Sequence, residues 1–160
     1  MEATPITLDK TIVRQITLPE TYPVRRTVLY PNSPESKIYI PNDEQGIHFG
    51  AFLHGDLIAV ISLFREPIPT SESPPCGPSK SLRFRKFACL RSHQSRGIGT
   101  QLFRHVLNFA RKDPHLGLGT LVWCDARWST REWYLKRGMN VLGQRFSKGD
   151  IEYIVMAIQV

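Results

Sequence analysis

Gln94-Ser95-Arg96-Gly97-Ile98-Gly99 is the stretch that decides the fold, because it stands between an apolar run at 87–90 and an amphipathic run that begins at Thr100. Apolar residues recur there at the three-and-four spacing of a helix with one buried face, at Ile98, Leu102, Phe103, Val106, Leu107 and Ala110. The pattern predicts a strand, a glycine turn and a helix start. Glycine lacks a Cβ, so a ligand can approach closely, and the free N–H groups of a helix N-terminus attract anions. The stretch therefore predicts a phosphate-binding turn.

The glycine spacing separates three kinds of phosphate loop. A dinucleotide fingerprint needs a third glycine where Leu102 stands, and a Walker loop needs Gly-Lys-Ser/Thr where Gly99-Thr100-Gln101 stands. The remaining pattern, Gln/Arg-x-x-Gly-x-Gly/Ala, resembles the pyrophosphate-binding motif of the GNAT superfamily of acyl-CoA N-acyltransferases. A glycine-tightened strand-to-helix turn without a ligand is the structural alternative.

A second stretch, residues 125–139, carries the same resemblance. In the superfamily a strand ends at Asn-Ala-Arg, and the next helix carries Ala-x-x-Phe-Tyr-x-x-x-Gly-Phe. Ala126-Arg127, Tyr134 and Gly138 match this motif in place. The departures are Asp125 for Asn, Thr130 for Ala, Trp133 for Phe and Met139 for the last Phe. Trp and Met preserve apolar bulk, whereas Asp125 adds a negative charge where an amide often faces the cofactor.

The order of apolar patterns predicts an α+β fold along the chain. We expect a strand at 11–17, a short helix with Pro19 and Pro23 in its first turn, a mobile polar connection at 35–45, and a hairpin of strands 46–53 and 57–64. A proline-rich loop at 66–81 follows. The strand at 81–90 feeds the glycine turn, and its apolar period slips at Arg85-Lys86, which predicts a bulge.

The second half predicts a parallel crossover and a closing hairpin. A strand at 120–124 follows the helix, and strands at 140–146 and 151–159 end the chain. The resemblance implies a GNAT-like mixed, twisted central sheet of about seven strands, flanked by helices and splayed at the cofactor-binding strand. We expect one N-acetyltransferase domain over residues 1–160.

Composition limits the class of protein. Hydrophobic residues make up 41% and charged residues 22%, and no apolar run approaches the ~20 residues of a membrane span. The N-terminus lacks the pattern of a signal peptide. Cys76, Cys89 and Cys124 show neither pairing nor metal-ligand spacing, so we expect reduced thiols and no metal. The expectation is a cytoplasmic or otherwise intracellular protein, the nucleus included, without a membrane partner.

The net charge of +7 favours anionic ligands. Basic residues crowd the strand before the glycine turn, at Arg83, Arg85, Lys86, Arg91 and Arg96. They form either an entrance for a polyphosphate or a solvated face. The chain has no recognisable DNA- or RNA-binding motif, so we predict no specific nucleic-acid binding, and we expect a monomer or a homodimer.

The resemblance also implies a reaction. It implies transfer of the acetyl group of acetyl-CoA to a primary amine by direct attack in a ternary complex, with Tyr134 as general acid and a strand N–H near Cys89 for the oxyanion. The cofactor contacts that it implies are Phe87, Cys89, Arg91, Gln94, Ser95, Arg96, Gly97, Ile98, Gly99, Thr100 and Asp125.

Two parts of this reaction have no marker in the sequence. The general base is open among Glu66, Glu152, His48 and Asp56. The acceptor is open among a small amine, an amino acid, a peptide N-terminus and a protein lysine. The rival hypothesis is a catalytically degenerate acyl-CoA-binding or regulatory module.

Overall fold

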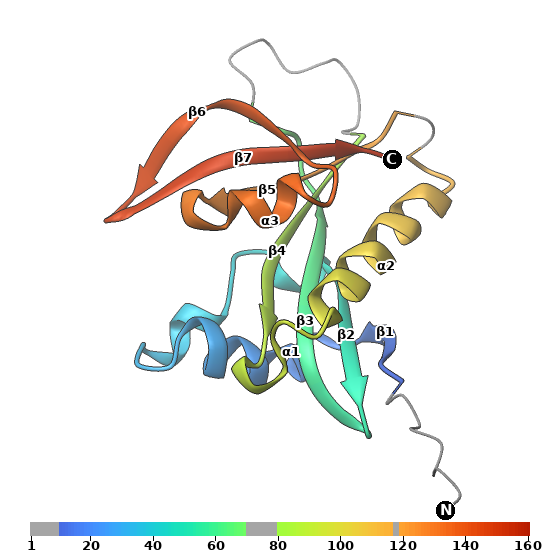
Figure 1. Ribbon diagram of the computed structural model, residues 1–160, viewed down its shortest axis with the longest axis vertical. Helices are drawn as coiled ribbons and strands as arrows, with labels where there is room; N and C mark the ends of the chain where they lie inside the picture. The colour runs from blue at the N-terminus through green and yellow to red at the C-terminus, as the bar shows by residue number, and fades with distance from the viewer. Residues whose placement is uncertain (1–9, 70–79, 117–118) are drawn as a thin grey trace, which may run out of the picture.

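The computed structural model describes residues 10–69, 80–116 and 119–160, and its framework is a mixed seven-stranded sheet (Figure 1). The strands, in chain order, are β1 Ile12–Ile16, β2 Ile47–Leu53, β3 Asp56–Arg65, β4 Ser81–Cys89, β5 Leu121–Arg127, β6 Asn140–Lys148 and β7 Ile151–Gln159. Their spatial order is β1-β2-β3-β4-β5-β7-β6, and β4 with β5 is the parallel pair. This confirms the predicted α+β class and mixed sheet. Residues 70–79 of the proline-rich loop, with Cys76, and Gly117 lie outside the described residues.

The helices cover both faces of the sheet. They are α1 Leu18–Val24, which continues as the π-helix η1 Arg25–Leu29, then α2 Ile98–Lys112 and α3 Arg131–Leu135. The short 3-10 turns are η2 Glu35–Ile38, η3 Asp43–Gln45, η4 Arg91–His93 and η5 Trp128–Thr130.

Alternation along β3 shows which helix covers which face. Ile61 and Leu63 belong to the core beneath α2, whereas Val60 packs with Val24 of α1. The apolar stripe that predicted α2 is buried at all six of its positions, Ile98, Leu102, Phe103, Val106, Leu107 and Ala110. Helical periodicity in the sequence therefore identified the buried face of α2 correctly.

The segment between β1 and β2 differs from the expectation in two ways. Pro19 lies in the first turn of the helix, but Pro23 lies inside it, so that prediction was wrong. Because a proline has no N–H to donate, the helical ladder is interrupted there, and the chain widens into the π-helix η1 directly afterwards. The expected polar connection at 35–45 also buries Ile38 and Asp43.

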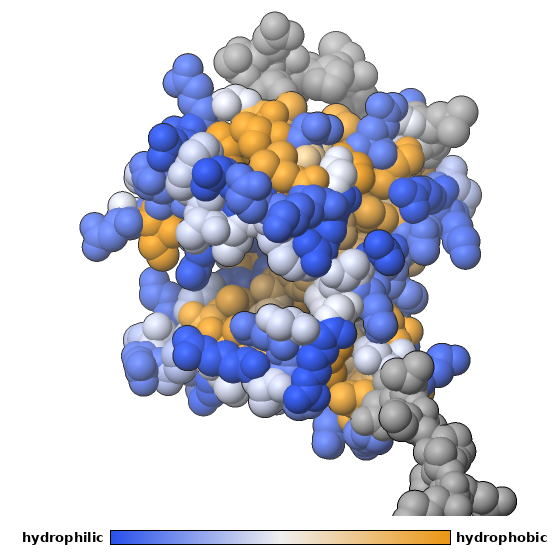
Figure 2. All heavy atoms as spheres, viewed as in Figure 1, coloured by the Kyte–Doolittle hydropathy of each residue, from blue (hydrophilic) through white to orange (hydrophobic). Residues whose placement is uncertain are grey.

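The bulge in β4 lies where the apolar period slips. Ser62 of β3 pairs with Arg85 while Val60 pairs with Ala88, so β4 holds one extra residue there, and Lys86 has a φ of 53°. Strand β4 pairs with β5 only from Ser81–Leu121 to Arg83–Trp123. Beyond Arg83 the two strands part, and the molecule is hollowed between its two halves (Figure 2).

Candidate functional site

Two cavities adjoin the place where β4 and β5 part. The glycine-turn cavity has a volume of about 510 Å³ and is lined by Phe87, Ala88, Cys89, Gln94, Ser95, Gly97, Gly99, Thr100, Ser129, Thr130, Trp133, Tyr134 and Arg137. The basic cavity has a volume of about 870 Å³ and is lined by Val28, Leu29, Tyr30, Arg83, Phe84, Arg85, Lys86, Phe87, Arg91, Gln94, Cys124, Asp125, Ala126, Arg127, Thr130, Tyr134, Lys148 and Tyr153. Phe87, Gln94, Thr130 and Tyr134 line both cavities. The two cavities therefore meet at these residues.

The glycine turn has the backbone geometry of an anion site. Gly97 precedes α2 with a φ of 80°, and a Cβ built there would meet no atom within 4 Å. The N–H of Gln101 donates to the carbonyl of Gly97 at 3.0 Å, so the N–H groups of Ile98, Gly99 and Thr100 precede the helical ladder and have no acceptor in it. Open space and unpaired donors thus coincide at the positive end of the helix dipole.

Gln94 fixes the glycine turn to the end of β4. Its Nε2 donates a hydrogen bond of 2.9 Å to the carbonyl oxygen of Cys89. Cys89 is half-buried, and burial raises the pKa of its thiol. The thiol therefore stays protonated near neutral pH, which makes Cys89 a poor nucleophile.

Arg137 is a residue of the glycine-turn cavity that the sequence analysis missed. Its Nε donates to Thr100 Oγ1 at 2.9 Å, one terminal nitrogen donates to the carbonyl of Trp133 at 2.8 Å, and the guanidinium lies 3.6 Å from the centroid of the Trp133 ring. It places a positive charge beside the first turn of α2. Arg137 follows Trp133 by four residues within the stretch 125–139, and this helical spacing was the signal in the sequence that could have identified it.

Tyr134 is held by aromatic packing at the meeting point of the cavities. Its ring centroid lies 5.0 Å from that of Trp133 and 5.8 Å from that of Phe84. Burial is the main cause that raises the pKa of the phenol, so Tyr134 keeps its proton at neutral pH. A protonated phenol can donate to a group that spans both cavities.

The predicted cofactor residues divide between different places. Phe87, Cys89, Gln94, Ser95, Gly97, Gly99 and Thr100 line the glycine-turn cavity. Arg91 and Asp125 line the basic cavity instead. Ile98 is a core residue that is 3% exposed, so only its backbone can serve a ligand, and Arg96 is exposed and lines neither cavity.

Asp125 is an ion-paired residue in this structure. Its Oδ2 accepts hydrogen bonds of 2.7 Å from Arg83 and of 2.7 Å from Lys148. Its Oδ1 is buried without a hydrogen-bond partner among the residues that the structure describes. The negative charge that the sequence placed against the cofactor is therefore neutralised by two cations of the basic cavity.

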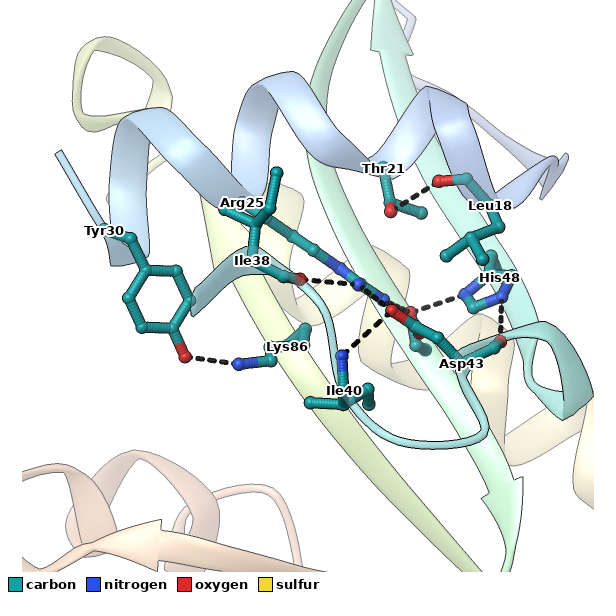
Figure 3. A network of polar contacts seen from close by, with 10 residues as sticks. Leu18, Thr21, Arg25, Tyr30, Ile38, Ile40, Asp43, His48 and Lys86 are labelled. Atoms are coloured by element: carbon teal, nitrogen blue, oxygen red, sulfur yellow. Dashed lines mark hydrogen bonds and ion pairs between the residues drawn. The ribbon is translucent and has the colours of Figure 1, made fainter. Parts of the chain in front are cut away.

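Lys86 places a primary amine in the wall of the basic cavity. Its Nζ donates to Tyr30 Oη and lies 4.4 Å from the centroid of that ring (Figure 3). Burial, followed by the charge of Arg25, lowers the pKa of this amine to about 8. The left-handed backbone of the bulge presents Lys86 there, which composition alone did not indicate.

A buried polar network supports the wall that η1 contributes. Arg25, which is 0% exposed, donates to Asp43 through one terminal nitrogen at 2.6 Å and through the other at 3.0 Å (Figure 3). It also donates to Ser62 Oγ at 2.8 Å, and His48 Nδ1 lies 2.7 Å from the same oxygen. The network connects η1, η3 and β3.

No candidate base lines either cavity among the described residues. His48 is buried in the network just described, Glu66 pairs with Arg83, Glu152 pairs with Arg145, and Asp56 opens the strand β3. His48 therefore has a structural role. The described part of the chain also holds no cluster of His, Cys, Asp or Glu that could bind a metal, and none of its helices is long and apolar enough to cross a membrane.

Comparisons with known proteins agree with this geometry. The profile of the acetyltransferase (GNAT) family matches residues 12–139. The uncharacterized N-acetyltransferase YitI of Bacillus subtilis strain 168 is 29% identical over 149 residues, which are 90% of this chain and 93% of that protein.

Solved structures share the fold. A putative N-acetyltransferase from Lactobacillus plantarum superposes with a TM-score of 0.71 at 16% identity, over 94% of this chain and 97% of that one. A Bacillus subtilis acetyltransferase in complex with CoA superposes with a TM-score of 0.65 at 15% identity, over 94% of this chain and 99% of that one.

Proposed function

The chain belongs to the GNAT family of acetyltransferases, and from this premise we propose that it transfers the acetyl group of acetyl-CoA to a primary amine. The observation that carries the proposal is the meeting of two cavities at Tyr134, where β4 and β5 part. One cavity offers a site for the cosubstrate and the other a site for the acceptor. Both substrates can then be bound at once, which supports direct attack in a ternary complex.

The glycine-turn cavity fits a pyrophosphate and an extended thiol arm. The free N–H groups at the start of α2 would bind the phosphates, and Arg137 adds a cation beside them. Past Arg83, β4 has no pairing with β5, so its backbone amides on that side are available to the pantetheine arm as to an added strand. Phe87 and Trp133, with ring centroids 5.6 Å apart, form an apolar wall.

The reaction requires one bond to form and one to break. The neutral amine nitrogen attacks the thioester carbonyl carbon, and an N–H of β4 near Cys89 stabilises the oxyanion. The C–S bond then breaks, and Tyr134 gives its proton to the departing thiolate. The acetylated nitrogen releases one proton to water, and the phenolate regains one from solvent. The products are an N-acetylamine and free coenzyme A.

Covalent catalysis by cysteine is the competing mechanism for the described thiols. Burial raises the pKa of Cys89 and of Cys124, and Cys124 is 3% exposed, so both resist forming a thiolate. Initial-rate kinetics distinguish the mechanisms. A ternary complex gives double-reciprocal lines that intersect, whereas an acyl-cysteine gives parallel lines.

Gly97→Leu tests the cosubstrate site. A leucine side chain would occupy the open space beside the free amides, so calorimetry with coenzyme A should show no binding. Gly55→Leu is the matched control, because Gly55 has a φ of 84°, has open space around it and lies in the hairpin between β2 and β3. Unchanged affinity in Gly97→Leu would refute the site.

Tyr134→Phe tests catalysis against the rival acyl-CoA-binding module. We expect the variant to lose turnover by about 100-fold or more while it keeps its affinity for coenzyme A. The ion pairs of Asp125 weaken the case for a catalytically degenerate module, because Arg83 and Lys148 already neutralise its charge. A protein that binds coenzyme A yet acetylates no amine of a broad panel would favour the binding module.

A further inference from the structure

We infer that the amine acceptor carries an anionic group, a carboxylate or a phosphate, and that the basic cavity binds this group. The inference rests on the proposed function, because it assigns a chemical class to the acceptor in that reaction. Amino acids and phosphorylated amines belong to this class. Polyamines and other polycations do not.

The charges that line the basic cavity carry the inference. Its lining includes the cations Arg83, Arg85, Lys86, Arg91, Arg127 and Lys148, and its acid is Asp125. Asp125 is already shared by Arg83 and Lys148. Within residues 10–69, 80–116 and 119–160, the other four cations have no carboxylate partner. An anionic ligand would supply the missing counter-charge.

Arg85 is well placed to bind that anion. It pairs with Ser62 of β3 directly before the bulge, is half-buried, and precedes the bulge residue Lys86. A guanidinium withdrawn from bulk water forms stronger bonds with a carboxylate or phosphate than an exposed one does, and its planar fork suits bidentate binding. Arg85 and Lys86 both line the basic cavity, so one anionic group bound there can contact both.

Coenzyme A does not account for these cations. The sequence left the basic run from Arg83 to Arg96 open between a polyphosphate entrance and a solvated face. The structure instead places Arg83, Arg85 and Lys86 in the basic cavity and none of the three in the glycine-turn cavity. The cation that lines the glycine-turn cavity is Arg137. The two cavities therefore have separate sources of positive charge.

The same charges would prepare the acceptor amine for attack. Nearby cations and burial both disfavour a protonated amine. Lys86 is a resident example, since the pKa of its amine falls from 10.5 to about 8. An acceptor amine in this cavity would lose its proton to water close to neutral pH, and none of Glu66, Glu152, His48 and Asp56 would be needed as its base.

Matched acceptor pairs test the inference in the full-length protein. The panel pairs each amino acid with its carboxamide and O-phosphoethanolamine with ethanolamine, and adds spermidine as a polycation. We expect kcat/KM for the anionic member of the productive pair to exceed that of its neutral partner by about tenfold to a hundredfold, the range of one to two charged hydrogen bonds. The carboxylate and phosphate arms identify which anion is bound.

Variants assign the effect to the cavity. Arg85→Met should raise KM for the anionic acceptor about tenfold and leave KM for acetyl-CoA unchanged. Arg127→Gln, at the exposed end of β5, is a second variant, and it stays informative even if replacing Arg85 disturbs the folding of β4. Lys112→Met, at the exposed end of α2, is the charge-matched control and should change neither constant.

The outcomes separate this inference from the proposed function. Preference for the carboxamides or for spermidine overturns the inference while acetyl transfer stands. The inference is also overturned if the protein binds coenzyme A but acetylates none of the anionic acceptors. If coenzyme A does not bind the wild type, the proposed function fails first, and that result is read by calorimetry without any acceptor.

Discussion

Replacing Asp43 by Asn should destabilise the fold strongly, because it leaves the buried Arg25 guanidinium without a counter-charge. Asp43 is 3% exposed and accepts three bonds, two from Arg25 at 2.6 and 3.0 Å and one from the N–H of Ile40 at 3.3 Å. Asparagine preserves the shape of the side chain. It removes the negative charge and replaces one acceptor oxygen with an NH₂ donor that faces Arg25.

The expected loss in the free energy of unfolding is about 3–5 kcal/mol, the usual cost of removing one partner from a buried ion pair. The upper part of this range applies, since Arg25 is 0% exposed and water cannot replace the lost partner. Native domains are stable by about 5–15 kcal/mol, so the loss is a large share of the total. Ser62 and the carbonyl of Ile38 still accept bonds from Arg25, but neither carries a charge.

Urea denaturation monitored by tryptophan fluorescence measures this loss. Glu44→Gln is the matched control, because Glu44 is the exposed neighbour in the same 3-10 turn and loses the same charge. The control should change stability by less than about 0.5 kcal/mol. A loss below about 1 kcal/mol in Asp43→Asn at an unchanged m-value would refute the reasoning, since it would mean that Arg25 is solvated or differently paired.

Three further predictions concern single positions. Arg137→Met should weaken coenzyme A binding about tenfold by calorimetry, while the exposed neighbour in Lys136→Met should have no effect; equal affinities would remove Arg137 from the site. In Gly99→Ala the new Cβ would lie 3.5 Å from Trp133, so the fold should gain up to about 1 kcal/mol while coenzyme A affinity falls, and a gain in affinity would contradict the close approach. Burial, followed by the charge of Arg25, lowers the pKa of His48 below 6.5, so the unfolded chain binds the proton first. The urea concentration at the unfolding midpoint should therefore fall as the pH decreases from 6.5 toward the lowered folded-state pKa, and His48→Gln should flatten this dependence. An identical slope in the variant would show that His48 is not the group that titrates.

Local patterns in the sequence predicted the elements around the site. Gly97 before α2 and Gly99 in its first turn need no distant partner to form the glycine turn, and the apolar stripe from Ile98 to Ala110 shows the buried face of the helix by its own period. The slip at Arg85-Lys86 marked the bulge for the same reason, because side-chain alternation is a property of one strand. The family was predicted from the resemblance of the glycine turn and of residues 125–139 to two motifs of the GNAT superfamily.

The tertiary structure alone decided how the charged residues pair. Asp125 binds Arg83 and Lys148, which lie 42 and 23 residues away, and Arg25 binds Asp43 from the far side of a connection that composition described as polar. The sequence around an ionisable residue has no periodic pattern that reveals its ion-pair partner. The residue type alone is therefore compatible with a solvated position or with a buried ion pair. The placement of Arg83, Arg85, Lys86 and Arg91 in the basic cavity, and of none of them in the glycine-turn cavity, has the same cause, because the parting of β4 from β5 determines which cavity each cation lines.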